Sequence, residues 1–270
     1  MKHSFTKTIL LVSVCAFAYG AKPAWCATND VVTAGNTNET SWTISKEGHE
    51  IEESIAKAPE VILSMTNNVE EYTSMICEKI VKCPVPETRY RYFRKLMESA
   101  CQVDFVKIVE NVPEEKMPDE SNGFLIWSGM YGDPKLGALW DAYRPLRRLA
   151  DDIWENLAFT RVSTPCAEQF EPYFKLIEKL KTEERRLEKS IPSTIEHIRE
   201  EVEFVADRIE YHFHFLYLQH LCKSPDPQDL ALFKARFERV VGRPVRSLDE
   251  YEADSRRRMD EIIKRRKGGL

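Results

Sequence analysis

Three histidines lie among aromatic residues in the segment RIEYHFHFLYLQHLC, residues 208–222. Because imidazole is the commonest metal ligand among side chains, the segment raises the question of a metal site. In an α-helix, neighbouring residues are rotated by about 100°, so His212 and His214 point about 200° apart. His212 and His220 share a face more nearly, but eight residues rise about 12 Å, too far for one ion. A helix therefore predicts that His212 lies in the core and that no pair chelates unaided.

Two alternatives to a core position involve other geometry or other ligands. In a strand, His212 and His214 would share a face and could converge on an ion, but the segment continues a helical pattern without a turn residue. In a helix, Asp207 and Glu210 share a face with His214 and could contribute to a site in a bundle. Di-iron carboxylate bundles place a Glu three residues before His, which no histidine here has. Surface ion pairing is the favoured interpretation, and no metal or cofactor is predicted.

A second place for chemistry is residues 111–135, where prolines and glycines interrupt the helical pattern. Long irregular segments inside a domain are often functional. Three aromatic residues within it, Phe124, Trp127 and Tyr131, are candidates for the lining of a small-ligand pocket, together with the aromatic residues of 211–217. The alternative is that these rings pack on the helices.

Catalytic hypotheses are weaker. Glu120 and Asp133 flank the loop aromatics, and two carboxylates beside aromatic rings suit a wall-polysaccharide hydrolase. Acidic residues are so frequent here that a chance pairing is easy. The chain has no nucleophile elbow, no phosphate-binding glycine loop and no C-x-x-C-H haem motif. An enzyme is therefore less favoured than a binding or structural protein.

The first twenty residues resemble a secretory signal peptide. Lys2 and Lys7 precede the apolar run TILLVSVCAFAYG, which is too short to span a bilayer comfortably. Cleavage is expected after Gly20, with Ala18 as the alternative, and predicts a periplasmic or secreted protein with no integral membrane span. Residues 21–45 are expected to form a flexible leader, and residues 46–270 a helical domain that could divide near 111–135.

Charge and cysteine content follow from that cleavage. The chain has 39 basic and 44 acidic residues, and loss of the two leader lysines changes its formal charge from −5 to −7. This argues against nucleic-acid binding. An even set of cysteines would enter an oxidising compartment, where at least one disulfide is expected with open connectivity. The candidates are Cys26, Cys77, Cys83, Cys101, Cys166 and Cys222.

Apolar residues recur every three or four positions through most of the chain, which predicts amphipathic helices. One helix is expected from Pro59 to Ile80, and the next begins at Pro86, since proline is favoured in the first turn. Helical spacing resumes from Leu139 to Leu157. Heptad-like spacing over 173–191 and 195–216 predicts a coiled-coil-like antiparallel hairpin.

Capping residues mark several helix ends. Ser193 and Glu196 match a capping box, and the last helix is expected to start at Ser247-Leu248-Asp249-Glu250. A further helix is expected from Asp226-Pro227 to Gly242. Together these signals predict an all-α fold, an antiparallel long-helix bundle with a coiled-coil-like hairpin and one long irregular loop.

The function predicted from these features is that of an exported helical interaction or structural protein without catalytic activity. It would associate with itself or with a protein partner. A small-ligand-binding helical protein is the second hypothesis, and the hydrolase with Glu120 and Asp133 is the third. The basic cluster Lys264–Lys267 is a weak signal for an anionic surface, because acidic residues interleave with the preceding helix.

Overall fold

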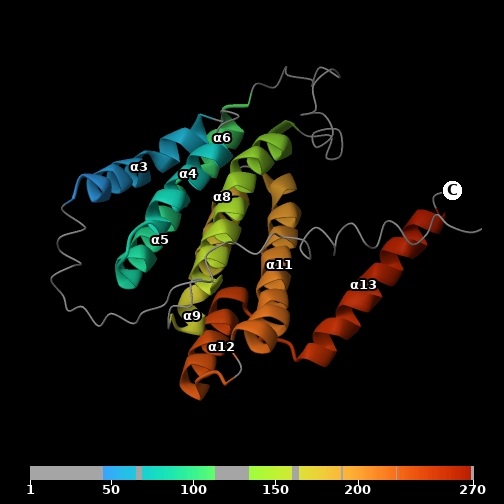
Figure 1. The fold of residues 1–270 in the computed structure, drawn as a ribbon. Helices are drawn as coiled ribbons and strands as arrows, with labels where there is room; N and C mark the ends of the chain where they lie inside the picture. Colours follow the sequence, from blue (N-terminus) through green and yellow to red (C-terminus); the bar gives the residue numbers. More distant parts are fainter. Residues whose placement is uncertain are drawn as a thin grey trace, which may run out of the picture. The chain divides into compact units, whose positions relative to one another are not determined.

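The computed structural model describes residues 45–64, 69–112, 134–159, 164–189, 191–222 and 224–268. These residues all belong to one compact unit, residues 39–270, and contain helices without any strand (Figure 1). The all-helical prediction is therefore confirmed for the described residues. The expected signal peptide and all of the expected leader except Ser45 lie outside them.

The structure describes ten α-helices in this order along the chain. Their bounds are α3 Lys46–Leu63, α4 Val69–Val81, α5 Pro86–Ala100, α6 Phe105–Glu110, α8 Pro134–Phe159, α9 Cys166–Gln169, α10 Glu171–Leu187, α11 Ile195–Tyr211, α12 Pro227–Val241 and α13 Leu248–Gly268. A 3₁₀ turn, Pro192–Thr194, precedes α11, and a π-helix, His212–Leu221, follows it.

The first helix begins earlier than expected. Ser45 accepts a hydrogen bond from the Gly48 backbone nitrogen at 3.1 Å and caps α3, so Pro59 lies inside the helix instead of starting it. The apolar residues Ile51, Ile55 and Ile62 extend the buried stripe back to the first turns. In contrast, the predicted start of α5 at Pro86 is confirmed, and the short helix α6, capped by Asp104, was not predicted.

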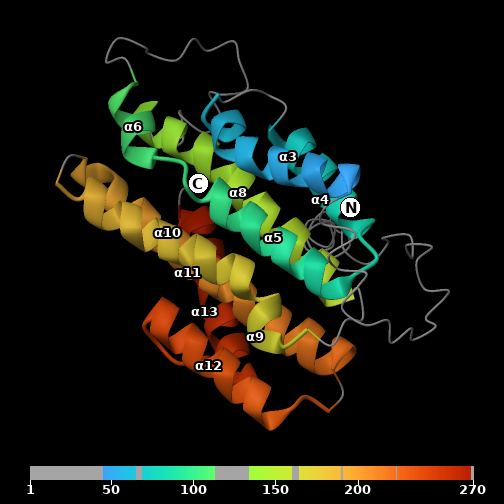
Figure 2. The ribbon, with the colours of Figure 1, turned by 90° about the vertical axis from the view of Figure 1, so that its left-hand side faces the viewer.

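Helix α10 lies at the centre of the packing and contacts α5, α6, α8, α11 and α12. Figure 2 shows it beside α11. Glu184 on α10 accepts a hydrogen bond from Arg199 Nε on α11 at 2.5 Å, and Tyr173 at the other end of α10 stacks on His212 with ring centroids 5.8 Å apart. These two contacts hold α10 and α11 together at both ends.

The histidine segment forms a π-helix, so the strand alternative is wrong. The Cys222 backbone nitrogen donates to the Tyr217 carbonyl, the five-residue spacing that defines this helix. His212 is 4% exposed and stacks on Trp154 at 4.0 Å, and burial lowers its pKa to about 3. The predicted core position of His212 is confirmed. Among the described residues, no group of three or more His, Cys, Asp or Glu side chains could hold a metal ion.

Predicted helix ends are confirmed at three of four sites. Asp226 caps α12, Gly242 ends it in the left-handed conformation with φ 95°, and Ser247 and Glu250 bond reciprocally at the start of α13. The capping box at Ser193 is wrong, because the 3₁₀ turn carries the chain one residue further. The residue before α11 is Thr194, whose hydroxyl donates to the Ile191 carbonyl.

No disulfide joins any two of the five described cysteines, which corrects the expectation for pairs among them, and Cys26 lies outside the described residues. Cys77, Cys83 and Cys166 are buried, and Cys101 and Cys222 are half-buried. The thiols behave as small apolar side chains of the core. Burial raises the pKa of Cys101 to about 12 and those of Cys77 and Cys166 further.

An ion cluster joins α11 to the start of α13. Glu210, expected on the surface, has a fully buried side chain. Arg243 donates one hydrogen bond to each of its carboxylate oxygens, at 2.9 and 3.0 Å. The Arg246 guanidinium donates two hydrogen bonds to Oε2, at 2.5 and 3.0 Å. Arg246 also pairs with Asp207 and Asp254, and Arg258 pairs with Asp207. The guanidinium groups keep the pKa of Glu210 below its usual value despite burial.

Removing this carboxylate should be costly, since it would leave two arginines without their shared partner. We expect Glu210→Ala to lower the free energy of unfolding by about 3 kcal/mol or more in urea titrations. The control is Glu203→Ala, which removes a 56% exposed partner of Arg243 and should cost about 1 kcal/mol or less. Equal losses in the two variants would contradict this account.

Candidate functional site

Most residues predicted to line a pocket or to act as catalysts lie outside the described residues: Phe124, Trp127, Tyr131, Glu120 and Asp133. Within the described residues, the aromatic residues of 211–217 do not line either of the two cavities considered below. Phe213 packs in the core on Phe233, with centroids 4.5 Å apart. The pocket expected between 124–131 and 211–217 therefore stays a prediction.

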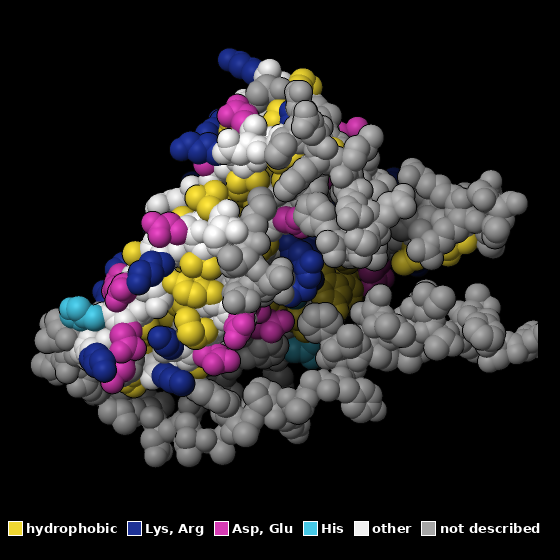
Figure 3. Space-filling model, turned by 90° about the horizontal axis from the view of Figure 1, so that it is seen from above, with side chains coloured by type: hydrophobic (Ala, Val, Ile, Leu, Met, Phe, Trp, Pro, Cys, Tyr) yellow, Lys and Arg dark blue, Asp and Glu magenta, His cyan; other side chains and the backbone are white. Residues whose placement is uncertain are grey.

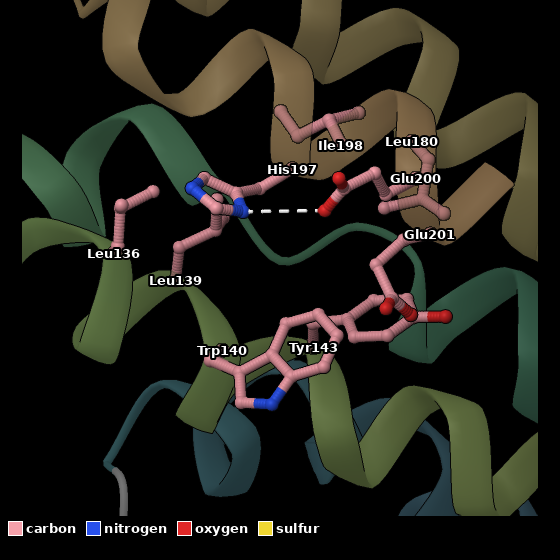
Figure 4. A pocket seen from close by; sticks show the side chains of 9 residues that line it. All are labelled: Leu136, Leu139, Trp140, Tyr143, Leu180, His197, Ile198, Glu200 and Glu201. Atoms are coloured by element: carbon pink, nitrogen blue, oxygen red, sulfur yellow. Dashed lines mark ion pairs between the residues drawn. The ribbon is translucent and has the colours of Figure 1, made fainter. Parts of the chain in front are cut away.

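A cavity lies between the first half of α8 and the first half of α11, over α10. It has about 440 Å³ of empty space, including space continuous with solvent. Six apolar or aromatic side chains and three polar ones line it, as Figure 4 shows: Leu136, Leu139, Trp140, Tyr143, Leu180, Ile198, His197, Glu200 and Glu201. Such a mostly apolar concavity with a few polar groups is the usual composition of a small-molecule site.

Helical spacing brings the lining residues together. Leu136, Leu139, Trp140 and Tyr143 are three or four positions apart and share one face of α8. The rings of Trp140 and Tyr143 stack with centroids 5.1 Å apart and an interplanar angle of 28°. Leu180 is the only contribution of α10. The α8 side of the cavity is thus a rigid apolar and aromatic wall.

Burial raises the pKa of two groups that line this cavity, Tyr143 and Glu201. The Glu201 side chain is 15% exposed, and Figure 4 shows that it and Tyr143 point toward one another. Neither Glu201 Oε2 nor the Tyr143 hydroxyl has a hydrogen-bond partner among the described residues. Burial raises the pKa of Glu201 to about 7, and Arg147, with Nη1 3.9 Å from Oε2, and the facing Tyr143 hydroxyl lower it only in part.

The other polar groups lie toward solvent. His197 Nδ1 is 3.5 Å from Glu200 Oε2, and their side chains are 33% and 66% exposed. With Glu201, they form a polar edge opposite the aromatic wall. The cavity can therefore hold an apolar group against α8 and a polar group near α11, and Glu201 can gain or lose a proton near neutral pH.

No family model, no curated protein and no solved structure matches this chain. No helix within the described ranges is both long enough and apolar enough to cross a membrane. Figure 3 shows basic and acidic side chains intermixed over the described part of one face. Function must therefore be argued from the cavity itself.

Sequence reasoning placed Trp140 and Tyr143 only in a helical stripe and did not single out His197, Glu200 or Glu201. One signal was present. Glu201 directly precedes Val202 of the α11 seam and follows Ile198 by three positions, so it borders the buried face. A carboxylate at such a position indicates a partly buried acid.

A second cavity, of about 230 Å³, lies between α5, α8 and α10. Arg94, Lys175 and Glu171 bring charges of both signs to it, and Leu157 contributes part of its apolar lining. This cavity is smaller than the one between α8 and α11.

The raised pKa of Glu201 predicts a pH dependence of stability. A carboxyl that holds its proton more tightly when folded stabilises the fold below its ordinary pKa of 4.5, and this contribution is lost as pH rises through about 7. We expect Glu201→Gln, which cannot ionise, to become more stable relative to wild type between pH 5 and pH 8 in urea titrations. Glu200→Gln, at an exposed carboxylate, should show no such trend. A pH-independent difference for Glu201→Gln would refute the assignment.

Proposed function

We propose that this protein is a non-enzymatic small-ligand-binding helical protein whose site is the cavity between α8 and α11. The observation that carries the proposal is the concavity between α8 and α11, which opens to solvent and combines an aromatic wall with a buried carboxylate oxygen that has no hydrogen bond of ordinary geometry among the described residues. A buried polar atom without a partner costs free energy, and a ligand that supplies a partner offsets that cost.

We further propose that the helices form an antiparallel bundle in which α10 and α11 are a hairpin. The contacts Glu184–Arg199 and Tyr173–His212 support this, because each joins residues nearly equidistant from the link between the two helices. A hairpin packed on α8 would keep the cavity walls at a constant separation, which reduces the ordering cost of binding.

Filling the cavity should abolish binding of an apolar probe. We expect 2-phenylethanol to shift the backbone amide resonances of residues 136–143 and 197–201 in NMR titrations, and Leu139→Phe to weaken binding about tenfold or more. Leu157→Phe is the matched control, since it makes the same change at a similarly buried leucine of α8 that lines the other cavity. Binding that survives Leu139→Phe, or that disappears equally in the control, would refute the proposal.

Self-association is a second candidate function, favoured by exposed aromatic residues on α11. Phe204 and Tyr211 are 45% and 44% exposed and lie seven residues apart on one face. If this face joins two copies, sedimentation velocity should show a dimer that Phe204→Ser with Tyr211→Ser converts to monomer. Leu232→Ser on α12, at a 65% exposed leucine, should leave the dimer intact. A wild-type monomer at high concentration would exclude this function.

A further inference from the structure

We infer that the ligand of the α8–α11 cavity is an organic ammonium: an apolar or aromatic body with a protonated amine. This rests on the proposed function and adds the chemical class of the ligand. The lining carries two carboxylates, Glu200 and Glu201, at one edge and the stacked rings of Trp140 and Tyr143 at the other. Carboxylates and the faces of aromatic rings both attract cations.

The charges around Glu201 favour a cation over an anion. From α8, the neighbours are Tyr143 and Arg147, and from α11 they are His197 and Glu200; the only lining residue from α10 is the uncharged Leu180. Arg147 does not line the cavity, and its guanidinium lies over the Phe204 ring at 5.1 Å. An anionic ligand would face Glu200 and Glu201, and the described part of the lining contains no guanidinium to offset them.

The geometry also favours a hydrogen-bond donor at the inner end of the ligand. Among the described residues, buried Glu201 Oε2 accepts no hydrogen bond of ordinary geometry; the Tyr143 hydroxyl faces it, and Arg147 Nη1 is 3.9 Å away. An ammonium can supply a donor and a second positive charge together, whereas a hydroxyl supplies only the donor. Its carbon skeleton would lie against Leu136, Leu139 and Trp140 on α8.

Two probes with one carbon skeleton separate charge from shape. The experiment compares 2-phenylethylamine, protonated at pH 8, with neutral 2-phenylethanol by isothermal titration calorimetry on the full chain. The amine should bind about tenfold tighter, since a charge-assisted hydrogen bond contributes more than a neutral one. In Glu201→Gln the two affinities should become nearly equal, while Glu200→Gln should retain most of the preference.

A second measurement needs no variant. Because the ammonium requires ionised Glu201, its binding at pH 7 should release protons, seen as a heat that differs between buffers of different ionisation enthalpy. Alcohol binding should release none.

The outcomes are distinct. If alcohol and amine bind equally, the cationic class is wrong and the ligand-binding function stands. If neither probe binds the folded protein, both proposals fail. If the amine is preferred equally in Glu201→Gln, its cation is bound elsewhere and the inference is overturned.

Discussion

The burial of α10 is the constraint on which the rest of the structure depends. Its apolar residues Tyr173, Phe174, Ile177 and Leu180 are nearly inaccessible to solvent, and α8 and α11 both pack on it. The α8–α11 cavity exists because these two helices rest on a common third helix. Side chains that would otherwise close the gap are held on rigid helix faces, where packed rotamers leave little freedom to collapse.

Three ionisable groups show that the effect of burial on a pKa depends on the neighbouring side chains. His212 is stacked between Trp154 and Tyr173 and stays neutral, because burial lowers its pKa to about 3. Glu210 is equally buried but stays charged, because two arginines surround it. A neutral His212 is compatible with an apolar core, whereas the ion cluster around Glu210 links separate helices at the cost of desolvating several charges.

Glu201 is neither stacked in the apolar core, as His212 is, nor surrounded by arginines, as Glu210 is. Burial outweighs its ion pair with Arg147, 3.9 Å away, and the effect of the facing Tyr143 hydroxyl, so its pKa rises to about 7. Perturbed groups inside a cavity are characteristic of functional sites. The contrast with Glu210, nine residues later on the same helix, shows that the difference arises from the neighbouring segments: arginines of the α12–α13 link for one, and the aromatic wall of α8 for the other.

What the sequence alone determined is local: the helical class, the proline start of α5, the caps of α12 and α13, and the core position of His212. Each depends on residues within one or two turns, whose spacing and hydrogen bonds can be read along the chain. The helix starts predicted at Ser193 and Pro59 were wrong. A 3₁₀ turn moves the start of α11 past Ser193, and the cap at Ser45 places the start of α3 before Pro59. The tertiary structure alone decided the cavity, the buried state of Glu210, the separation of the thiols and the environment of Glu201. These depend on side chains from helices far apart in the chain, and desolvation and charge pairing act through space instead of along the sequence.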